Sequence, residues 1–276
     1  MEFYMKENIL ILAKTYPSPS EKYLETSCVA GITDTGAMRR LFPIPFRRLF
    51  EEQKFQKWQW IEAETLKSPQ DHRNESRRIN FDKIILKEKI DTRNNWEKRM
   101  PLIQQIPAIK LFLPEGKTPV VDEGVTLAVF SPDLPVRLEI AESAKEWTEE
   151  QLSKLRQLEG DDVLFPEDLR IPKAQLEKIP YDFYYVLNVE TTTGERRDIR
   201  IKIIDWEVCE LFRNCVKNSG AHWEKPFRNK MEKEMNGKNL KLLLGNIHRF
   251  PKTWLIVSLI YPPKQSAAME RQSVLF

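Results

Sequence analysis

The chain has 276 residues, 41% of them hydrophobic and 31% charged, which is enough apolar material for one large or two modest domains. The formal net charge is only +3, so an argument for a nucleic-acid partner has to come from local clusters of charge. Three cysteines, an odd and sparse count, argue against a disulfide-stabilised scaffold. The longest apolar run, 254–261, is far shorter than the roughly 20 residues that span a bilayer, so we expect a cytoplasmic protein without a membrane partner.

The first half of the chain reads as strands joined by short turns. Residues 9–15 are a mostly apolar run typical of a buried strand. Residues 27–32 and 37–42 flank a turn signal at 34–36 and therefore predict a β-hairpin. We expect further strands at 57–66 and 83–87, and short helices at 46–56 and 96–105.

The second half follows a similar loose plan. Thr148 and Gln151 have the spacing of a capping box and predict the start of a helix. Asp205 predicts the N-cap of a helix over 206–216, with Glu207 in its first turn, and a further helix is expected at 227–235. The expected strands are 126–130, 136–140, 183–190, 199–204, 240–244 and 254–261.

These elements predict a β-rich α+β protein. We expect two small, OB-like, partly open β barrels with intervening and flanking helices. The predicted divisions are an N-terminal OB-like domain over 1–130, a helical linking or inserted segment over 131–179, and a C-terminal OB-like domain over 180–276.

The candidate binding residues are cations that lie close to aromatic side chains. Arg39, Arg40, Arg47 and Arg48 follow the first hairpin turn beside Phe42 and Phe46, and arginine and phenylalanine are residue types that hold phosphates and stack on bases. The other candidates lie in a Trp-containing strand, a polar loop, the second hairpin and a basic loop near the end: Lys57, Trp58, His72, Arg73, Arg77, Arg78, Arg196, Arg197, His248, Arg249 and Lys252.

Each of these stretches also has an ordinary structural interpretation. The arginines can be strand-edge residues in salt bridges, Trp58 can belong to a core, and the loops can simply be solvated. Asp205 and Glu207, with Lys202 nearby, allow a metal-dependent nuclease as an alternative, although helix capping explains both carboxylates. Motifs for zinc, phosphate loops and dinucleotides do not occur, so no cofactor, metal or catalytic residue is predicted.

Three short segments carry a family resemblance. The strand Ile9 to Lys14, the segment Cys28 to Ile32 and the arginine-containing strand Met38 to Pro43 together resemble the dual OB-fold domains of bacterial conflict and mobile-element loci. The stretch from Asp205 to Glu207 before a helix, with residues 245–262, is similar to the C-terminal part of that group. The resemblance implies a nucleic-acid-binding module without its own catalysis, acting beside a helicase or nuclease in an antiviral or mobile-element system.

The sequence thus favours a non-catalytic protein that binds DNA or RNA. A single strand would lie across the curved face of an OB barrel, with an affinity that falls steeply with salt. The metal-dependent nuclease and a scaffold subunit that binds other proteins remain the alternatives.

Overall fold

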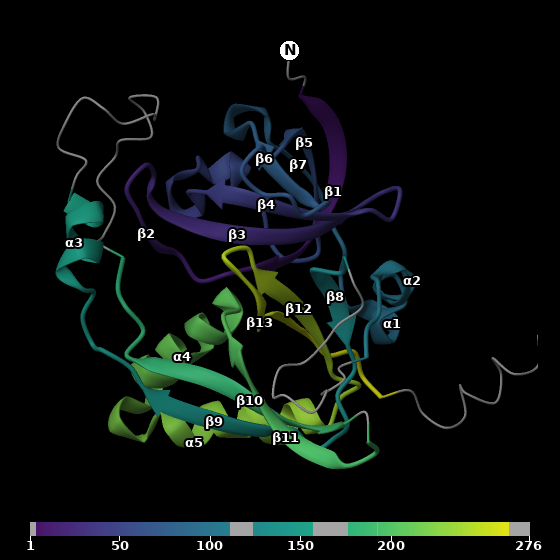
Figure 1. Ribbon diagram of the computed structural model, residues 1–276, viewed down its shortest axis with the longest axis vertical. Coiled ribbons are helices and arrows are strands. Elements are labelled where there is room, and N and C mark those ends of the chain that lie inside the picture. The colour runs from purple at the N-terminus through teal and green to yellow at the C-terminus, as the bar shows by residue number, and fades with distance from the viewer. Residues whose placement is uncertain (1–3, 111–123, 157–175, 192, 265–276) are drawn as a thin grey trace, which may run out of the picture.

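The computed structural model describes residues 4–110, 124–156, 176–191 and 193–264. It contains two β-sheets that lie one above the other along the long axis of the molecule, with helices at their margins (Figure 1). Within the described residues, no helix is both long and apolar enough to cross a membrane.

The first sheet is built by the N-terminal part of the chain. Five of its strands close into a barrel in the order β1-β3-β4-β6-β5, because β5 pairs back onto β1. The β4–β6 pair is parallel and the other barrel pairs are antiparallel. Its strands are β1 (Met5–Lys14), β2 (Ser18–Ser20), β3 (Leu24–Thr33), β4 (Met38–Ile44), β5 (Gln59–Lys67), β6 (Ser76–Ile79) and β7 (Ile85–Lys89). A closed five-stranded barrel of this kind is OB-like.

Alternation along the strands gives the barrel its interior. Ile9, Leu41, Ala63 and Ile79 point inward from four different strands and pack in one buried cluster. At Gly31 the strands β1 and β3 approach so closely that an added Cβ would lie 2.5 Å from the Ile9 side chain. Only glycine fits at this crossing.

The second sheet contains six strands and is open. Its order is β8-β12-β13-β11-β10-β9, and β11–β13 is its parallel pair. The strands are β8 (Leu127–Phe130), β9 (Arg137–Glu142), β10 (Tyr181–Glu190), β11 (Arg196–Ile203), β12 (Lys241–Ile247) and β13 (Phe250–Ile260). β8 and β9 belong to this sheet although the predicted divisions place them in the first domain and in the linking segment. Residues 157–175 of that predicted segment lie outside the described residues.

Helices cover one face of the second sheet. Phe212 of α4 (Trp206–Ser219) and Phe227 of α5 (Glu224–Arg228) have ring centroids 5.7 and 4.6 Å from that of Phe183 on β10. A π-helical stretch, Asn229–Glu234, continues α5. The remaining α-helices are α1 (Arg93–Trp96), α2 (Met100–Gln105) and α3 (Glu149–Arg156).

The predicted β-rich α+β class is confirmed, and most predicted elements are present. The predicted helix over 46–56 is wrong in detail: it is two 3-10 turns, Phe46–Arg48 and Glu51–Gln53. Leu49 and Phe50 between them have extended backbone, with ψ of 151° and 153°, which interrupts any continuous helix. Strand β6 follows the polar loop that contains His72 and Arg73, and it was not predicted.

The outer face of the barrel packs against the second sheet. A single buried cluster joins the barrel residues Leu10, Leu12, Ala30, Ile32 and Met38 to Leu127, Val129, Leu243, Val257 and Ile260. This barrel face includes β3 and β4, its second and third strands, which form the ligand-binding face in OB-folds. The expectation of an open sheet face for a single strand is therefore corrected: the second sheet covers it.

Candidate functional site

Seven of the predicted cations form ion pairs within the protein. The pairs are Arg39 with Glu7, Arg40 with Glu75, Arg47 with Glu25, Lys57 with Glu207, Arg73 with Asp71, Arg196 with Asp133, and Arg197 with Glu195. The positive charge of these seven residues is therefore at least partly neutralised by carboxylates of the protein itself.

Three predicted contact residues are buried, and this corrects their assignment. Arg40, Lys57 and Trp58 are 5%, 9% and 4% exposed. The Arg40 guanidinium donates to the carbonyl of Thr126 at 2.8 Å and lies against Gly245 of the second sheet, so it joins the two sheets. These side chains cannot reach a nucleic acid at the surface without unfolding their surroundings.

Other predicted residues lie apart from one another. Arg196 and Arg197 begin β11, toward the opposite end of the molecule from β5 and β6 (Figure 1). Arg47 and Arg48 lie in the first 3-10 turn near Glu25, and burial lowers the pKa of Arg48. Phe46, expected as a stacking platform, is part of the barrel interior. The four hairpin arginines therefore do not form one contact surface.

One end of the barrel gathers positive charge. Four charged residues lie an even number of positions from an interior residue of the same strand, so their side chains point inward at this end: Glu7, Arg39, Lys67 and Arg77. Glu7 accepts hydrogen bonds from Arg39 at 2.6 Å and from Thr65 at 2.5 Å. Glu7 is thus the inward-facing carboxylate beside Arg39 and Arg77.

The cations at this barrel end repel one another. Burial and then the charge of Arg77 lower the pKa of Lys67, although Asp71 and Glu75 oppose this. Burial and then the charge of Arg39 lower the pKa of Arg77, although Glu7 and Glu75 oppose this. The buried Nε of Arg77 has no hydrogen-bond partner among the described residues.

Two predicted loops converge beside the same barrel end. The loop 68–75 joins β5 to β6, and Arg73 in it donates to the carbonyl of Asn246 at 2.7 Å, next to the β12–β13 turn. The rings of His72 and His248 have centroids 6.0 Å apart, and His248 Nε2 lies 3.9 Å from Asp71. In OB-folds, the loop between the fourth and fifth strands, here 68–75, contributes to ligand binding.

These contacts bring a group of basic residues together near one end of the barrel. We call it the basic rim and define it by Lys67, His72, Arg77, His248, Arg249 and Lys252. Among the residues that the structure describes, its lysines and arginines have no carboxylate within 4.0 Å. Phe250, 63% exposed, is the first residue of β13, directly after the turn. The predicted contact residue Arg78 is not part of the basic rim, and its guanidinium donates to the Gln70 side chain in the loop 68–75.

Lys67 is the rim residue that the sequence analysis missed. It occupies the last position of β5, with the inward alternation of Ala63 and Thr65. That alternation was visible in the strand predicted at 57–66. The missing information was that the strand extends one residue further and ends at the mouth of a barrel.

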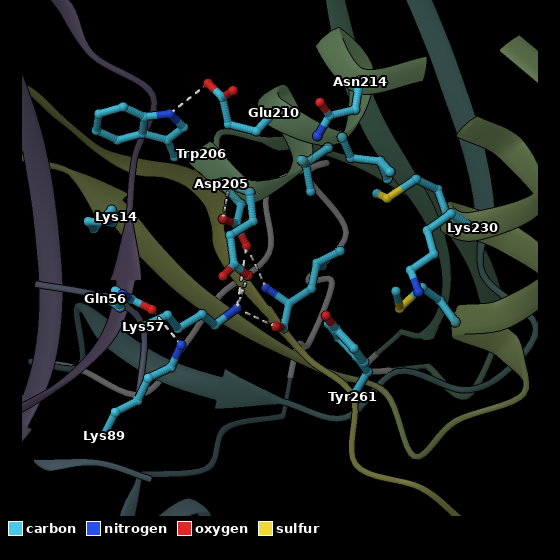
Figure 2. A pocket seen from close by; sticks show the side chains of 16 residues that line it. Lys14, Gln56, Lys57, Lys89, Asp205, Trp206, Glu210, Asn214, Lys230 and Tyr261 are labelled. Atoms are coloured by element: carbon cyan, nitrogen blue, oxygen red, sulfur yellow. Dashed lines mark hydrogen bonds and ion pairs between the residues drawn. The ribbon is translucent and has the colours of Figure 1, made fainter. Parts of the chain in front are cut away.

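The carboxylates of the nuclease alternative have structural partners. Asp205 accepts from the backbone N–H of Glu207 at 2.9 Å and of Leu259 at 3.0 Å, while Lys57 lies between Asp205 and Glu207 (Figure 2). Lys202 pairs with Asp182 at 2.7 Å. The arrangement predicted for a nuclease is not assembled, and within the described ranges no three metal-binding side chains cluster. The predicted helix cap at Asp205 is confirmed.

Two family descriptions match the chain. Residues 5–105 match a domain of unknown function (DUF8758), and residues 120–276 match a domain of unknown function (DUF8757). Neither description names an activity, and no curated protein matches the chain. Because the second match covers more than half of the sequence, the chain belongs to the family described as domain of unknown function DUF8757.

Proposed function

We propose that the protein binds nucleic acid along the basic rim. The observation that supports this most strongly is that Lys67 and Arg77 at the barrel end lie near the segment that contains Arg249 in the β12–β13 turn and Lys252 at the start of β13. None of these four cations has a carboxylate partner in the described part of the chain. Guanidinium and ammonium groups are the side chains that hold phosphates in proteins.

The proposal uses a different surface from the open face of an OB-fold. Because the second sheet covers β3 and β4, a strand would run over the barrel end and along the β12–β13 turn. Phe250 and the rings of His72 and His248 are placed to stack on unpaired bases there. Such stacking tolerates any base, so we expect a preference for single strands without strong sequence specificity.

Fluorescence anisotropy with a labelled single strand of DNA, the same RNA sequence and a DNA duplex, each at two salt concentrations, tests the proposal. We expect the single strands to bind more tightly than the duplex, and log K to fall with log salt by about 0.7 per phosphate contact. If none of the three binds at low salt, the proposal is wrong.

A matched pair of double variants locates the surface. Arg249→Gln with Lys252→Gln removes two rim charges and should reduce the salt slope by about 1.4, because each single-strand contact contributes about 0.7. Arg196→Gln with Arg197→Gln removes the same charge from the other predicted group and should leave the slope unchanged. Equal losses in both double variants would show non-specific attraction and contradict the proposed surface.

A further inference from the structure

A separate cavity opens where the barrel meets the second sheet. Its volume is about 520 Å³ (Figure 2), and a second hollow of about 510 Å³ adjoins it. Sites for small molecules have volumes of roughly 300–1,000 Å³. The two hollows share Lys57, Lys89, Glu207, Lys230, Leu259 and Tyr261.

The acidic groups around these hollows are already occupied. Asp205 and Glu207 pair with Lys57, and Glu234 pairs with Lys230 at 2.6 Å. Glu210 accepts a hydrogen bond from the Trp206 indole at 2.9 Å and pairs with Arg213 at 3.5 Å. Asp205 and Glu207 share one lysine. The described lining has four carboxylates and six cations, so the excess of positive charge is two.

Four lining cations remain without a carboxylate within 4.0 Å among the described residues: Lys14, Lys89, Arg99 and Lys238. Arg99 is 6% exposed, donates to the carbonyl of Ile90, and lies 4.7 and 4.8 Å from the ring centroids of Trp58 and Trp96. Uncompensated positive charge in a concave, partly desolvated site attracts anions. These four cations are distributed over both hollows, so an anion that is long enough to reach from one hollow to the other could contact several of them.

Lys14 is the cation held in the most apolar surroundings. Its Nζ lies 3.7 Å from the ring centroid of Phe46 and 5.3 Å from that of Trp206, and it donates to the carbonyl of Phe55 at 3.2 Å. Burial lowers the pKa of Lys14 to about 8; the carboxylates of Glu207 and Asp205 oppose this, and Lys89 adds to it. An anion bound here would hold the proton on Lys14.

Part of the cavity lining is apolar. Met231, Met235 and Leu259 belong to it, and Tyr261 lies on the side of the cavity away from Lys14 and Lys89 (Figure 2). Methionine side chains adapt to irregular ligands and make favourable contacts with aromatic rings. A ligand with an anionic chain and a flat organic ring could contact both the lining cations and the apolar residues.

We propose that this cavity binds a nucleoside polyphosphate, with its phosphates at Lys14 and Lys89 and its ring against Met231, Met235 and Tyr261. The site is independent of the basic rim, because none of the rim residues lines either hollow.

Isothermal titration calorimetry of the full chain with ATP, inorganic triphosphate and adenosine tests the proposal. ATP should bind more tightly than triphosphate, and adenosine most weakly. Lys14→Met and Lys89→Met should each weaken ATP binding at least tenfold. Lys87→Met, on the same strand as Lys89 but paired with Glu62 outside the cavity, should change it less than twofold.

Two further results would separate the sites. ATP affinity should fall as the pH rises through about 8, and this dependence should disappear in Lys14→Met, whose circular dichroism verifies its fold. The Arg249→Gln, Lys252→Gln double variant should bind ATP unchanged. The proposal is wrong if ATP does not bind, if the cavity variants bind it like the wild type, or if only the rim variant loses it.

Discussion

Replacing Lys57 tests how firmly the barrel and the second sheet are joined. Its Nζ donates to Glu207 at 2.9 Å and to the Leu259 carbonyl at 2.8 Å, and lies 3.8 Å from Asp205. These partners come from the other half of the chain. Burial would lower the pKa of Lys57, but the two carboxylates outweigh it and raise the pKa, so the ammonium is charged at neutral pH.

In Lys57→Met the buried Asp205 loses its counter-charge. Removing one member of a buried ion pair destabilises a protein by about 3–5 kcal/mol. Asp205 keeps two backbone N–H donors, so we expect a value near the lower end, about 3 kcal/mol. Asp205→Asn keeps a cap of similar quality and should be milder.

A double-mutant cycle measures the interaction. Urea unfolding of the wild type, Lys57→Met, Asp205→Asn and the double variant should give a coupling free energy of about 1–3 kcal/mol, because the double variant removes both charges of the buried Lys57–Asp205 pair and leaves neither of them alone. Lys87→Met, which removes a surface pair with Glu62, should change stability by less than about 1 kcal/mol. Additive losses, or separate unfolding transitions for the two halves, would refute the reasoning.

Two more substitutions test local features. Hydrogen bonds from Arg73 and Ser76 overcome the effect of burial and lower the pKa of Asp71. The stabilising contribution of Asp71 is therefore present above the ordinary carboxyl pKa of about 3.9 and is lost as the pH falls below it. The difference in unfolding free energy between wild type and Asp71→Asn should shrink from pH 7 to pH 3, and a constant difference would contradict this. Gly31→Ala should destabilise the protein by more than about 3 kcal/mol, because its Cβ would overlap strand β1. Gly194→Ala has open space around it and should cost only about 1–2 kcal/mol, from backbone strain. Equal decreases in melting temperature for the two variants would show that β1 and β3 can move apart at Gly31.

Local sequence signals predicted the elements and caps well. The capping box is confirmed, with Thr148 N–H donating to the Gln151 side chain at 3.0 Å and Gln151 N–H donating to the Thr148 hydroxyl at 3.3 Å. These features depend on residues a few positions apart. Strand alternation likewise placed most strands, because one-sided burial is visible within a single segment.

Whether each cation pairs with a carboxylate could not be predicted in the same way. Arg39 pairs with Glu7, and Lys57 pairs with Glu207, partners that are 32 and 150 positions away. No local pattern distinguishes them from Arg249, which has no carboxylate partner in the described ranges. Charge clusters in a sequence therefore identify candidates, and tertiary structure decides which remain available.

The covered barrel face had a signal that was not used. Ile9 to Ala13 is a continuous apolar run, and all five side chains are buried. Continuous rather than alternating apolar residues are typical of a strand buried on both faces. Such a strand predicts that something packs on the outside of the barrel, which here is the second sheet.

Ultraviolet crosslinking of a bound single strand, followed by mass spectrometry of the peptides, tests the location of the nucleic acid most directly. We predict crosslinks within loop 68–75 and the β12–β13 turn, above all at His72, His248 and Phe250. Crosslinks concentrated instead near Arg196 and Arg197, or spread evenly over the surface, would contradict binding along the basic rim.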